Sequence, residues 1–303
     1  MSIKRPTSKD LIEVFGYAPD DLTPSVRSLW DLGACPFTNR KCTKGNHDST
    51  IVYGTCSVTT AHGDCIICPN RLYENDYQSL REVSKDSFGS ECEFVLFDEY
   101  IKRRNEKGPF IVALGQNSGK EVKLGRSLSM DWVLAKIQDS SLIEYTGIEV
   151  QSIDITNNYR DCWYAYKNLS KDTETIPPSE HGMNWANVHK RLIPQIIRKG
   201  VVYSNSKLVR SGIFFIIPDV VYKKFEEIIG SDIEQIEDKG PDSISIHTYK
   251  LSPPTTHGSQ RVIEIDRKIR VSLNDFSQRF ISGPNLPSGE ILDEAVRRVL
   301  GCQ

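Results

Sequence analysis

The chain has 303 residues, of which 38% are hydrophobic and 26% are charged, and its formal net charge is −2. This composition is ordinary for a globular protein and leaves room for one large domain and a smaller second one. No run approaches the roughly 18 consecutive apolar residues of a membrane-spanning helix, and no apolar segment follows the first residues as it does in a secretory signal. We therefore expect an intracellular protein with no membrane partner. The net charge alone does not predict nucleic-acid binding.

The N-terminal part of the chain divides into an expected helical segment and a cysteine-rich segment. Residues 1–33 place apolar side chains at roughly helical spacing, which predicts a helical lead-in. Residues 34–72 hold cysteines among Gly, Asn, Thr and Pro, residues typical of turns and short hairpins. Such a segment cannot bury a core of its own and needs an additional cross-link, such as a disulfide or a bound metal, to be stable. We predict an N-terminal segment with this module over 1–75 and a larger domain over 76–303.

The rest of the chain alternates between strand and helix patterns. The alternation of apolar and polar residues predicts strands over 129–137 and 146–155, and apolar runs predict strands over 109–114 and 212–218, the latter of buried type. Helical periodicity predicts helices over 184–198 (interrupted by Pro194), 222–230 and 290–300. Residues 239–260 are rich in Ser, Thr, Pro and Gly, which predicts a long loop. The expected fold class is α+β.

Five of the eight cysteines lie close together in the N-terminal module: Cys35, Cys42, Cys56, Cys65 and Cys68. In an intracellular protein such a group favours metal ligation over a disulfide framework. Four thiolates on short loops bind zinc or iron tetrahedrally. One ligand pair is Cys35 with Cys42, and the other is Cys56 with either Cys65 or Cys68. The alternative is a set of reduced cysteines in a loop-rich domain.

Two carboxylates and an amide lie on two consecutive predicted strands. Residues two apart in a strand share a face, so Glu149 and Gln151 project together while Val150 enters the core. If the strands are neighbours, with a hairpin that starts at Gly147, then Asp131 approaches Glu149. Two carboxylates and the carbonyl oxygen of Val150 suit Mg²⁺, which can activate water against a phosphate. Gln151 would orient that water. Exposed strands often carry such residues, so this pattern alone is weak evidence.

The order Asp, then Glu-x-Lys, on two strands is the signature of the PD-(D/E)xK nuclease superfamily, and this chain has Gln151 in place of the lysine. Joined to an N-terminal module of four cysteines, the pattern resembles the NotI-type restriction endonucleases, and the chain length is closer to their shorter, EagI-like members. The matching segments are 34–37, 42–44, 54–57, 66–71, 130–134, 147–151, 184–188 and 190–195.

The resemblance implies a type II restriction enzyme with an α/β/α core, working in the bacterial cytoplasm within a restriction-modification system. It implies a homodimer that makes Mg²⁺-dependent cuts in double-stranded DNA, at a GC-rich palindrome with a GGCC core, leaving a 5′ overhang. The catalytic residues it implies are Asp131, Glu149 and Gln151, with Mg²⁺ on the two carboxylates. Glu121 is the candidate for a further acidic residue, or else a surface residue.

For the cysteine module, the resemblance implies a structural iron, with zinc as the alternative. The ligands that follow from the family pattern are Cys35, Cys42, Cys56 and Cys68, which leaves Cys65 as a spare thiol. If Cys65 is the fourth ligand, this choice fails.

Other interpretations of the same residues remain open. His189, Arg191 and Lys199 are candidates for phosphate or base contacts by charge alone, but they also fit the solvated face of an amphipathic helix. The chain as a whole also fits a non-enzymatic, metal-stapled DNA-binding regulator, or a redox or sensing protein with iron in the cysteine group. A serine or cysteine hydrolase is poorly supported because no G-x-S-x-G motif is present.

Overall fold

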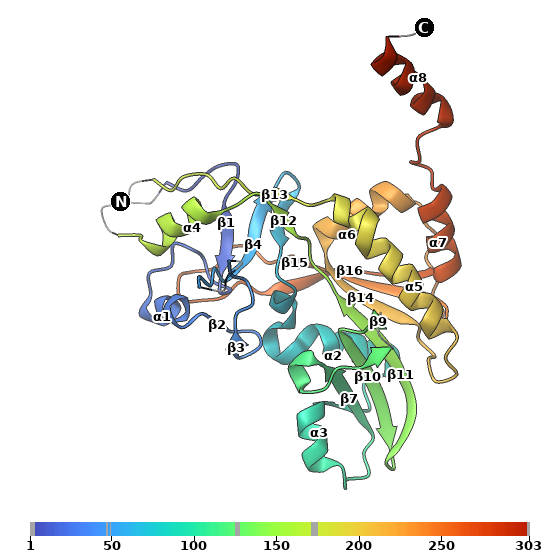
Figure 1. Cartoon of the computed structure of the whole chain (residues 1–303). Helices are drawn as coiled ribbons and strands as arrows, with labels where there is room; N and C mark the ends of the chain where they lie inside the picture. The colour runs from blue at the N-terminus through green and yellow to red at the C-terminus, as the bar shows by residue number, and fades with distance from the viewer. Residues whose placement is uncertain (1–3, 47, 49, 125–127, 171–174, 302–303) are drawn as a thin grey trace.

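A seven-stranded mixed sheet forms the centre of the protein (Figure 1). The computed structural model describes residues 4–46, 48, 50–124, 128–170 and 175–301. Across the sheet the order is β16 (Ile263–Ser272), β15 (Ser243–Leu251), β14 (Ile213–Pro218), β11 (Ser141–Val150), β10 (Trp132–Gln138), β7 (Phe110–Gly115) and β6 (Glu93–Leu96). β6 and β7 are parallel, as are β11, β14 and β15, and the other neighbours are antiparallel. The predicted α+β class is confirmed.

Helices cover both faces of this sheet. α5 (Ile193–Ser204), α6 (Asp219–Ile229) and α7 (Leu273–Ser282) pack on one face, and α2 (Glu74–Phe88) packs on the other (Figure 1). Strand β14 belongs to both cores, because Ile213, Phe215 and Ile217 contact the first and Phe214 and Ile216 contact the second. A strand buried on both faces is a continuous apolar run, and the prediction of a buried strand over 212–218 is confirmed.

The N-terminal part forms a smaller sheet, in which β1 (Leu11–Val14), β4 (Thr55–Thr60) and β5 (Gly63–Ile66) pair antiparallel in that order. The predicted helical lead-in is wrong for its first half, because residues 11–14 pair with β4 as a strand. A helix does follow, α1 (Pro24–Leu32), which starts with a proline and ends at Gly33 with a φ of 60°. Proline suits the first helical turn, and glycine suits the left-handed residue that closes a helix.

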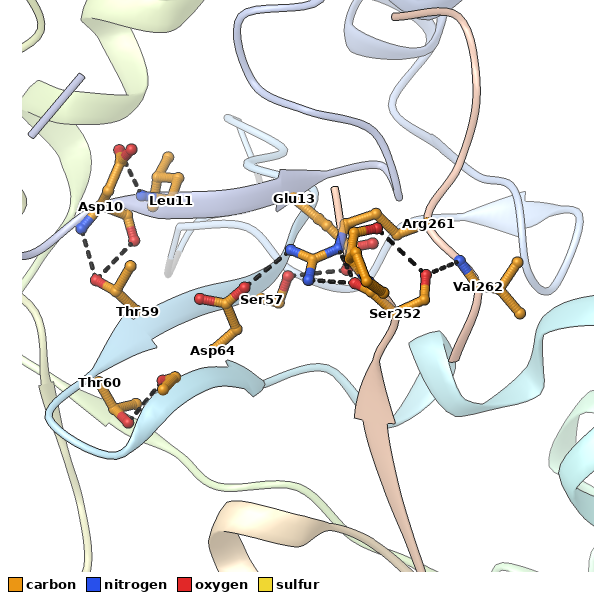
Figure 2. A network of polar contacts seen from close by, with 12 residues as sticks. Asp10, Leu11, Glu13, Ser57, Thr59, Thr60, Asp64, Ser252, Arg261 and Val262 are labelled. Carbon is orange, nitrogen blue, oxygen red and sulfur yellow. Dashed lines mark hydrogen bonds and ion pairs between the residues drawn. The ribbon is translucent and has the colours of Figure 1, made fainter. Parts of the chain in front are cut away.

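Two arginines bind the N-terminal sheet to the rest of the protein. Arg261, just before β16, donates to Asp64 on β5 at 2.9 Å and to the carbonyl oxygen of Ser252 (Figure 2). Arg71 is fully buried and forms ion pairs with Glu13 at 3.0 Å and with Glu74 at 2.5 Å. Apolar residues from both sides of residue 75 also share one core. The cysteine module is therefore held on the larger domain by buried contacts.

The predicted long loop over 239–260 is wrong for residues 243–251. Strand β15 occupies nine of these residues and lies between β14 and β16. Its small polar residues are buried but bonded: the Ser243 hydroxyl donates to the carbonyl of Gly240, and the Ser245 hydroxyl accepts from Arg270. Serine and threonine favour turns in isolation, but the partners supplied by neighbouring segments make them acceptable inside the sheet.

The remaining elements of the described chain are short or peripheral. They are β2 (Ala34–Cys35), β3 (Arg40–Lys41), the 3-10 helices η1 (Pro69–Tyr73) and η2 (Gln116–Ser118), α3 (Phe97–Arg103), β8 (Lys123–Leu124), β9 (Leu128–Ser129), β12 (Ile155–Thr156), α4 (Arg160–Lys167), β13 (Gly182–Met183), the π-helical turn η3 (Val188–Leu192) and α8 (Gly289–Leu300). The helix predicted over 184–198 is thus η3 followed by α5, whose first turn contains Pro194. None of the helices in the described ranges has the length and apolarity needed to span a bilayer.

Candidate active site at the end of strand β11

The β10–β11 hairpin brings the two predicted carboxylates together. Trp132 pairs with Ile148, so Asp131, which directly precedes β10, lies opposite Glu149. The predicted neighbouring strands are confirmed. The predicted hairpin start at Gly147 is wrong, because β11 begins at Ser141 and the turn is at residues 139–140. Gly147 lies inside the strand, where a side chain would collide with the ring of Tyr203 on α5.

Asp131 is fixed by hydrogen bonds from the end of β11. The backbone N–H of Val150 donates to its Oδ2 at 2.9 Å, and the Gln151 amide donates to the same oxygen at 3.3 Å. The backbone N–H of Asp131 in turn donates to Oε1 of Glu149 at 3.4 Å. The three residues Asp131, Glu149 and Gln151 therefore form one hydrogen-bonded group, as the alternation along the strands predicted.

Glu149 also has a partner that the sequence did not indicate. The Lys199 ammonium, from α5, lies 2.5 Å from Oε2 of Glu149, and both side chains are buried, with 9% and 2% exposure. The alternative that Lys199 lies on a solvated helix face is wrong, because its side chain is buried against Glu149. Its spacing from Glu149 in the sequence follows no local motif. Only the packing of α5 on the sheet brings the two together.

Burial controls the protonation of the two carboxyl groups. Burial, and after it the charge of Asp131, raise the pKa of Glu149 to about 7, although Lys199 opposes the shift. Burial also raises the pKa of Asp131, and the N–H of Val150 and the charge of Lys199 oppose that shift. Two carboxylates in a poorly solvated place repel each other unless a cation compensates them. One lysine compensates them only in part.

Asp131 and Gln151 line a cavity of about 410 Å³ that the cysteine module closes on one side. Glu121 lines the same cavity, and its charge contributes to the raised pKa of Asp131, after the larger effect of burial. Glu121 also lies 3.8 Å from the Lys123 ammonium. The candidate for a further acidic residue therefore lies near the carboxylate pair.

Most of the remaining cavity wall is polar or basic. The module contributes Thr38, Arg40, Lys41, Thr43 and Asn70, and η2 contributes Gln116 and Asn117. The Arg40 guanidinium donates to the carbonyl oxygen of Asn117 at 2.8 Å, so it joins the module to η2. The module and the carboxylate hairpin thus line one space.

A second cavity, of about 380 Å³, shares Thr43, Pro69 and Gln151 with the first. Its wall adds Lys44 from the module and Arg191 and Gln195 from η3 and α5. Of the two other basic residues suggested by charge, Arg191 lines this cavity, whereas His189 is an exposed residue of η3 outside its lining. The two cavities therefore lie side by side, with Gln151 in the wall of both.

Four of the module's cysteines lie near one another, and the fifth lies apart. Cys35, Cys42 and Cys56 pack in one cluster. Burial raises the pKa of Cys56 well above its ordinary value, and the nearby Cys68 and Cys42 raise it further. The fully buried Cys65 instead belongs to the large core, where burial and then Asp219 raise its pKa. This geometry favours Cys68 over Cys65 as the fourth member of the group.

The cysteine group and the carboxylate pair differ in how well they fit a metal ion. Across residues 4–46, 48, 50–124, 128–170 and 175–301, no group of three or more His, Cys, Asp or Glu side chains is spaced to hold a metal ion. The four thiols are therefore neighbours and not a closed tetrahedral group. For Mg²⁺ the donor set is suitable, because this ion commonly takes one or two protein carboxylates and completes its coordination with water and phosphate.

Comparison with known proteins adds no family assignment. No protein-family model matches the sequence, and a search of curated proteins finds no significant match.

Proposed function

We propose that this protein is a Mg²⁺-dependent endonuclease that cuts double-stranded DNA at specific sites. The observation that carries the proposal is the convergence of Asp131, Glu149 and Lys199, of which Asp131 lines a polar cavity. Two carboxylates and a lysine are the residue types of the PD-(D/E)xK pattern that the sequence resembles. Gln151 stands where that pattern has lysine, and Lys199 supplies the missing ammonium from α5.

Each residue of the site has a role in this proposal. Asp131 and Glu149 would hold Mg²⁺, which offsets charge on the scissile phosphate and lowers the pKa of a bound water. The Lys199 ammonium, held by Glu149, would donate to the phosphate or to the attacking water. Gln151 would orient that water with its amide. The reaction is hydrolysis, in which the water oxygen bonds to phosphorus and a phosphate ester bond breaks.

The polar walls of the two cavities support DNA as the substrate. Lysine and arginine side chains can bind backbone phosphates, while amides such as those of Asn70 and Gln195 can bond to base edges. Because the cysteine module supplies part of this wall, it would contribute to recognition. In the family resemblance, a structural iron or zinc on Cys35, Cys42, Cys56 and Cys68 would stabilise it.

The finer parts of the proposal come from that resemblance alone. They are a restriction-endonuclease-like α/β/α core, a homodimer, a GC-rich palindrome with a GGCC core, and a 5′ overhang. In this proposal the chain is the nuclease of a bacterial restriction-modification system.

The buried ion pair of Glu149 with Lys199 supports a second candidate function. A carboxylate neutralised inside the protein also suits a purely structural role. In that case the protein would be a DNA-binding regulator with a metal-stapled module. It would retain duplex DNA and would not cut it when Mg²⁺ is added.

Digestion of mixed genomic DNA distinguishes the two functions. Purified protein is incubated with the DNA and Mg²⁺, and the new ends are sequenced, with an EDTA-treated sample as the control. The nuclease proposal predicts ends that share one palindromic sequence, absent from the control. Retention of DNA without new ends would contradict it and favour the regulator.

A further inference from the structure

The last helix, α8, presents an apolar face to solvent. Ile291, Leu292, Val296 and Val299 fall along one side of this 12-residue helix, and they are 57%, 65%, 49% and 86% exposed. No residue of α8 is buried against the described part of the chain. Figure 1 shows the helix extending away from the sheet and its covering helices. Four large apolar side chains on one face are more than the scattered exposed residues of an ordinary surface.

The segment before α8 is held in place, so the helix projects from a defined position. Arg279 on α7 forms an ion pair with Asp232 at 2.7 Å. The Asn285 amide donates to the carbonyl oxygen of Glu227 at 2.7 Å. Ile281 and Leu286, in and after α7, are also exposed, at 66% and 65%.

The charges of α8 are divided between its two halves. The first half carries Glu290, Asp293 and Glu294, and the second half carries Arg297 and Arg298. Within the described ranges none of these five side chains forms an ion pair, although Asp293 and Arg297 have a favourable helical spacing. The same division of charge suits the dipole of the helix itself. It indicates a partner only in combination with the exposed apolar face.

We propose that α8 pairs antiparallel with the α8 of a second copy of this chain. Antiparallel pairing places the acidic half of each helix beside the basic half of the other, while the apolar faces meet. Parallel pairing would bring like charges together. Because a helix of 12 residues is about 18 Å long, the interface is small and association in the micromolar range is expected.

This inference deepens the homodimer of the proposed function, but its test needs neither DNA nor Mg²⁺. The test is sedimentation velocity over a concentration series of the full chain. The wild type is expected to reach the mass of a dimer. Arg297→Glu/Arg298→Glu makes α8 acidic throughout, and Glu290→Arg/Glu294→Arg makes it largely basic, so each variant alone is expected to stay monomeric. Their equimolar mixture is expected to recover the dimer.

Two results would overturn the inference. One is a wild-type monomer at every concentration, and the other is a dimer in both charge variants. A failed nuclease assay with a dimeric wild type would instead remove the proposed function and leave this interface intact.

A second pair of variants tests the apolar face. Leu292→Gln/Val296→Gln is expected to raise the dimer dissociation constant about a hundredfold or more, since four large apolar side chains leave the interface of two copies. The matched control is Leu22→Gln/Leu32→Gln, which changes two exposed residues, at 44% and 74%, far from α8 in the sequence. Unchanged association in the α8 variant, or equal loss in both, would contradict the proposal. Circular dichroism checks that every variant is folded.

Discussion

The carboxylate site and the cysteine group differ in how the protein stabilises them. Asp131 and Glu149 are ionisable groups in a buried place, and the chain compensates their negative charge with Lys199 and with backbone N–H groups. The thiols of Cys42, Cys56 and Cys68 have pKa values raised mainly by burial, so they are protonated and neutral near pH 7. Buried charges need partners in the folded chain itself, whereas neutral thiols do not.

This difference explains why the carboxylates are held in fixed positions while the thiols are not closed around a metal. The carboxylates already hold fixed positions through hydrogen bonds of 2.9 to 3.4 Å. A metal that binds the cysteines would have to displace the thiol protons and bring the four sulfur atoms closer together. The four experiments below test whether the two regions differ in this way.

The largest effect is expected for Glu149→Gln. Removing one of two ligands from a Mg²⁺ site should lower the cleavage rate at least about a hundredfold, because the ion supplies several kcal/mol of transition-state stabilisation. Binding to the same duplex should persist, since the proposed phosphate and base contacts come from other residues of the two cavities. Cleavage rate and gel-shift affinity are measured on the same preparations. Cleavage at the wild-type rate would remove Glu149 from the catalytic site.

Replacing Lys199 tests the internal compensation of charge. Lys199→Met leaves Glu149 buried without its partner and should lower the free energy of unfolding by about 3–5 kcal/mol. The double variant Glu149→Gln/Lys199→Met should regain most of that loss. Lys190→Met, at an exposed lysine of η3, is the control and should stay within about 0.5 kcal/mol of the wild type. Urea unfolding measures all four proteins. Equal stability of the Lys199 and Lys190 variants would show that the ion pair is unimportant.

The pH dependence of stability separates the two regions. The pKa of Glu149 rises from 4.5 to about 7 on folding, chiefly through burial, so between these values the folded state holds a proton that the unfolded chain has lost. The free energy of unfolding should therefore decrease as pH rises from about 4.5 to 7, by about 3 kcal/mol. The thiols stay protonated in both states over this range and add no slope.

Glu149→Gln should flatten this decrease, whereas Cys56→Ser should leave it unchanged. Unfolding is followed in urea at several pH values without metal. A wild-type stability that increases with pH over the whole window would contradict the raised pKa.

The smallest effect on stability is expected in the cysteine group. Cys56→Ser and Cys65→Ser should each lower the stability of metal-free protein by about 1–2 kcal/mol, because both residues are buried. Their metal contents should differ, because Cys56 lies with the other thiols and Cys65 does not. Elemental analysis should find one iron or zinc per chain in Cys65→Ser and none in Cys56→Ser. A metal-free wild type would remove the structural metal from the proposal.

The sequence predicted the parts of the site that depend on local pattern. Alternation along two short strands placed Asp131, Glu149 and Gln151 together, because strand periodicity and a hairpin are local properties. Lys199 was missed because it reaches Glu149 from a helix that packs on the sheet, and no sequence spacing encodes that contact. Strand β15 was missed for a similar reason, since its buried serines depend on partners such as Arg270 in a neighbouring strand. In both cases the structure depends on contacts between residues far apart in the sequence.

The proposed nuclease site requires that one divalent ion binds between Asp131 and Glu149. Crystals soaked in Mn²⁺, which can replace Mg²⁺, would show that ion directly by its anomalous scattering. We expect a peak within about 2.0–2.3 Å of a carboxylate oxygen from each of the two residues, with Lys199 still beside Glu149. A soaked crystal with no peak there, or with manganese bound only elsewhere, would contradict the proposed nuclease site.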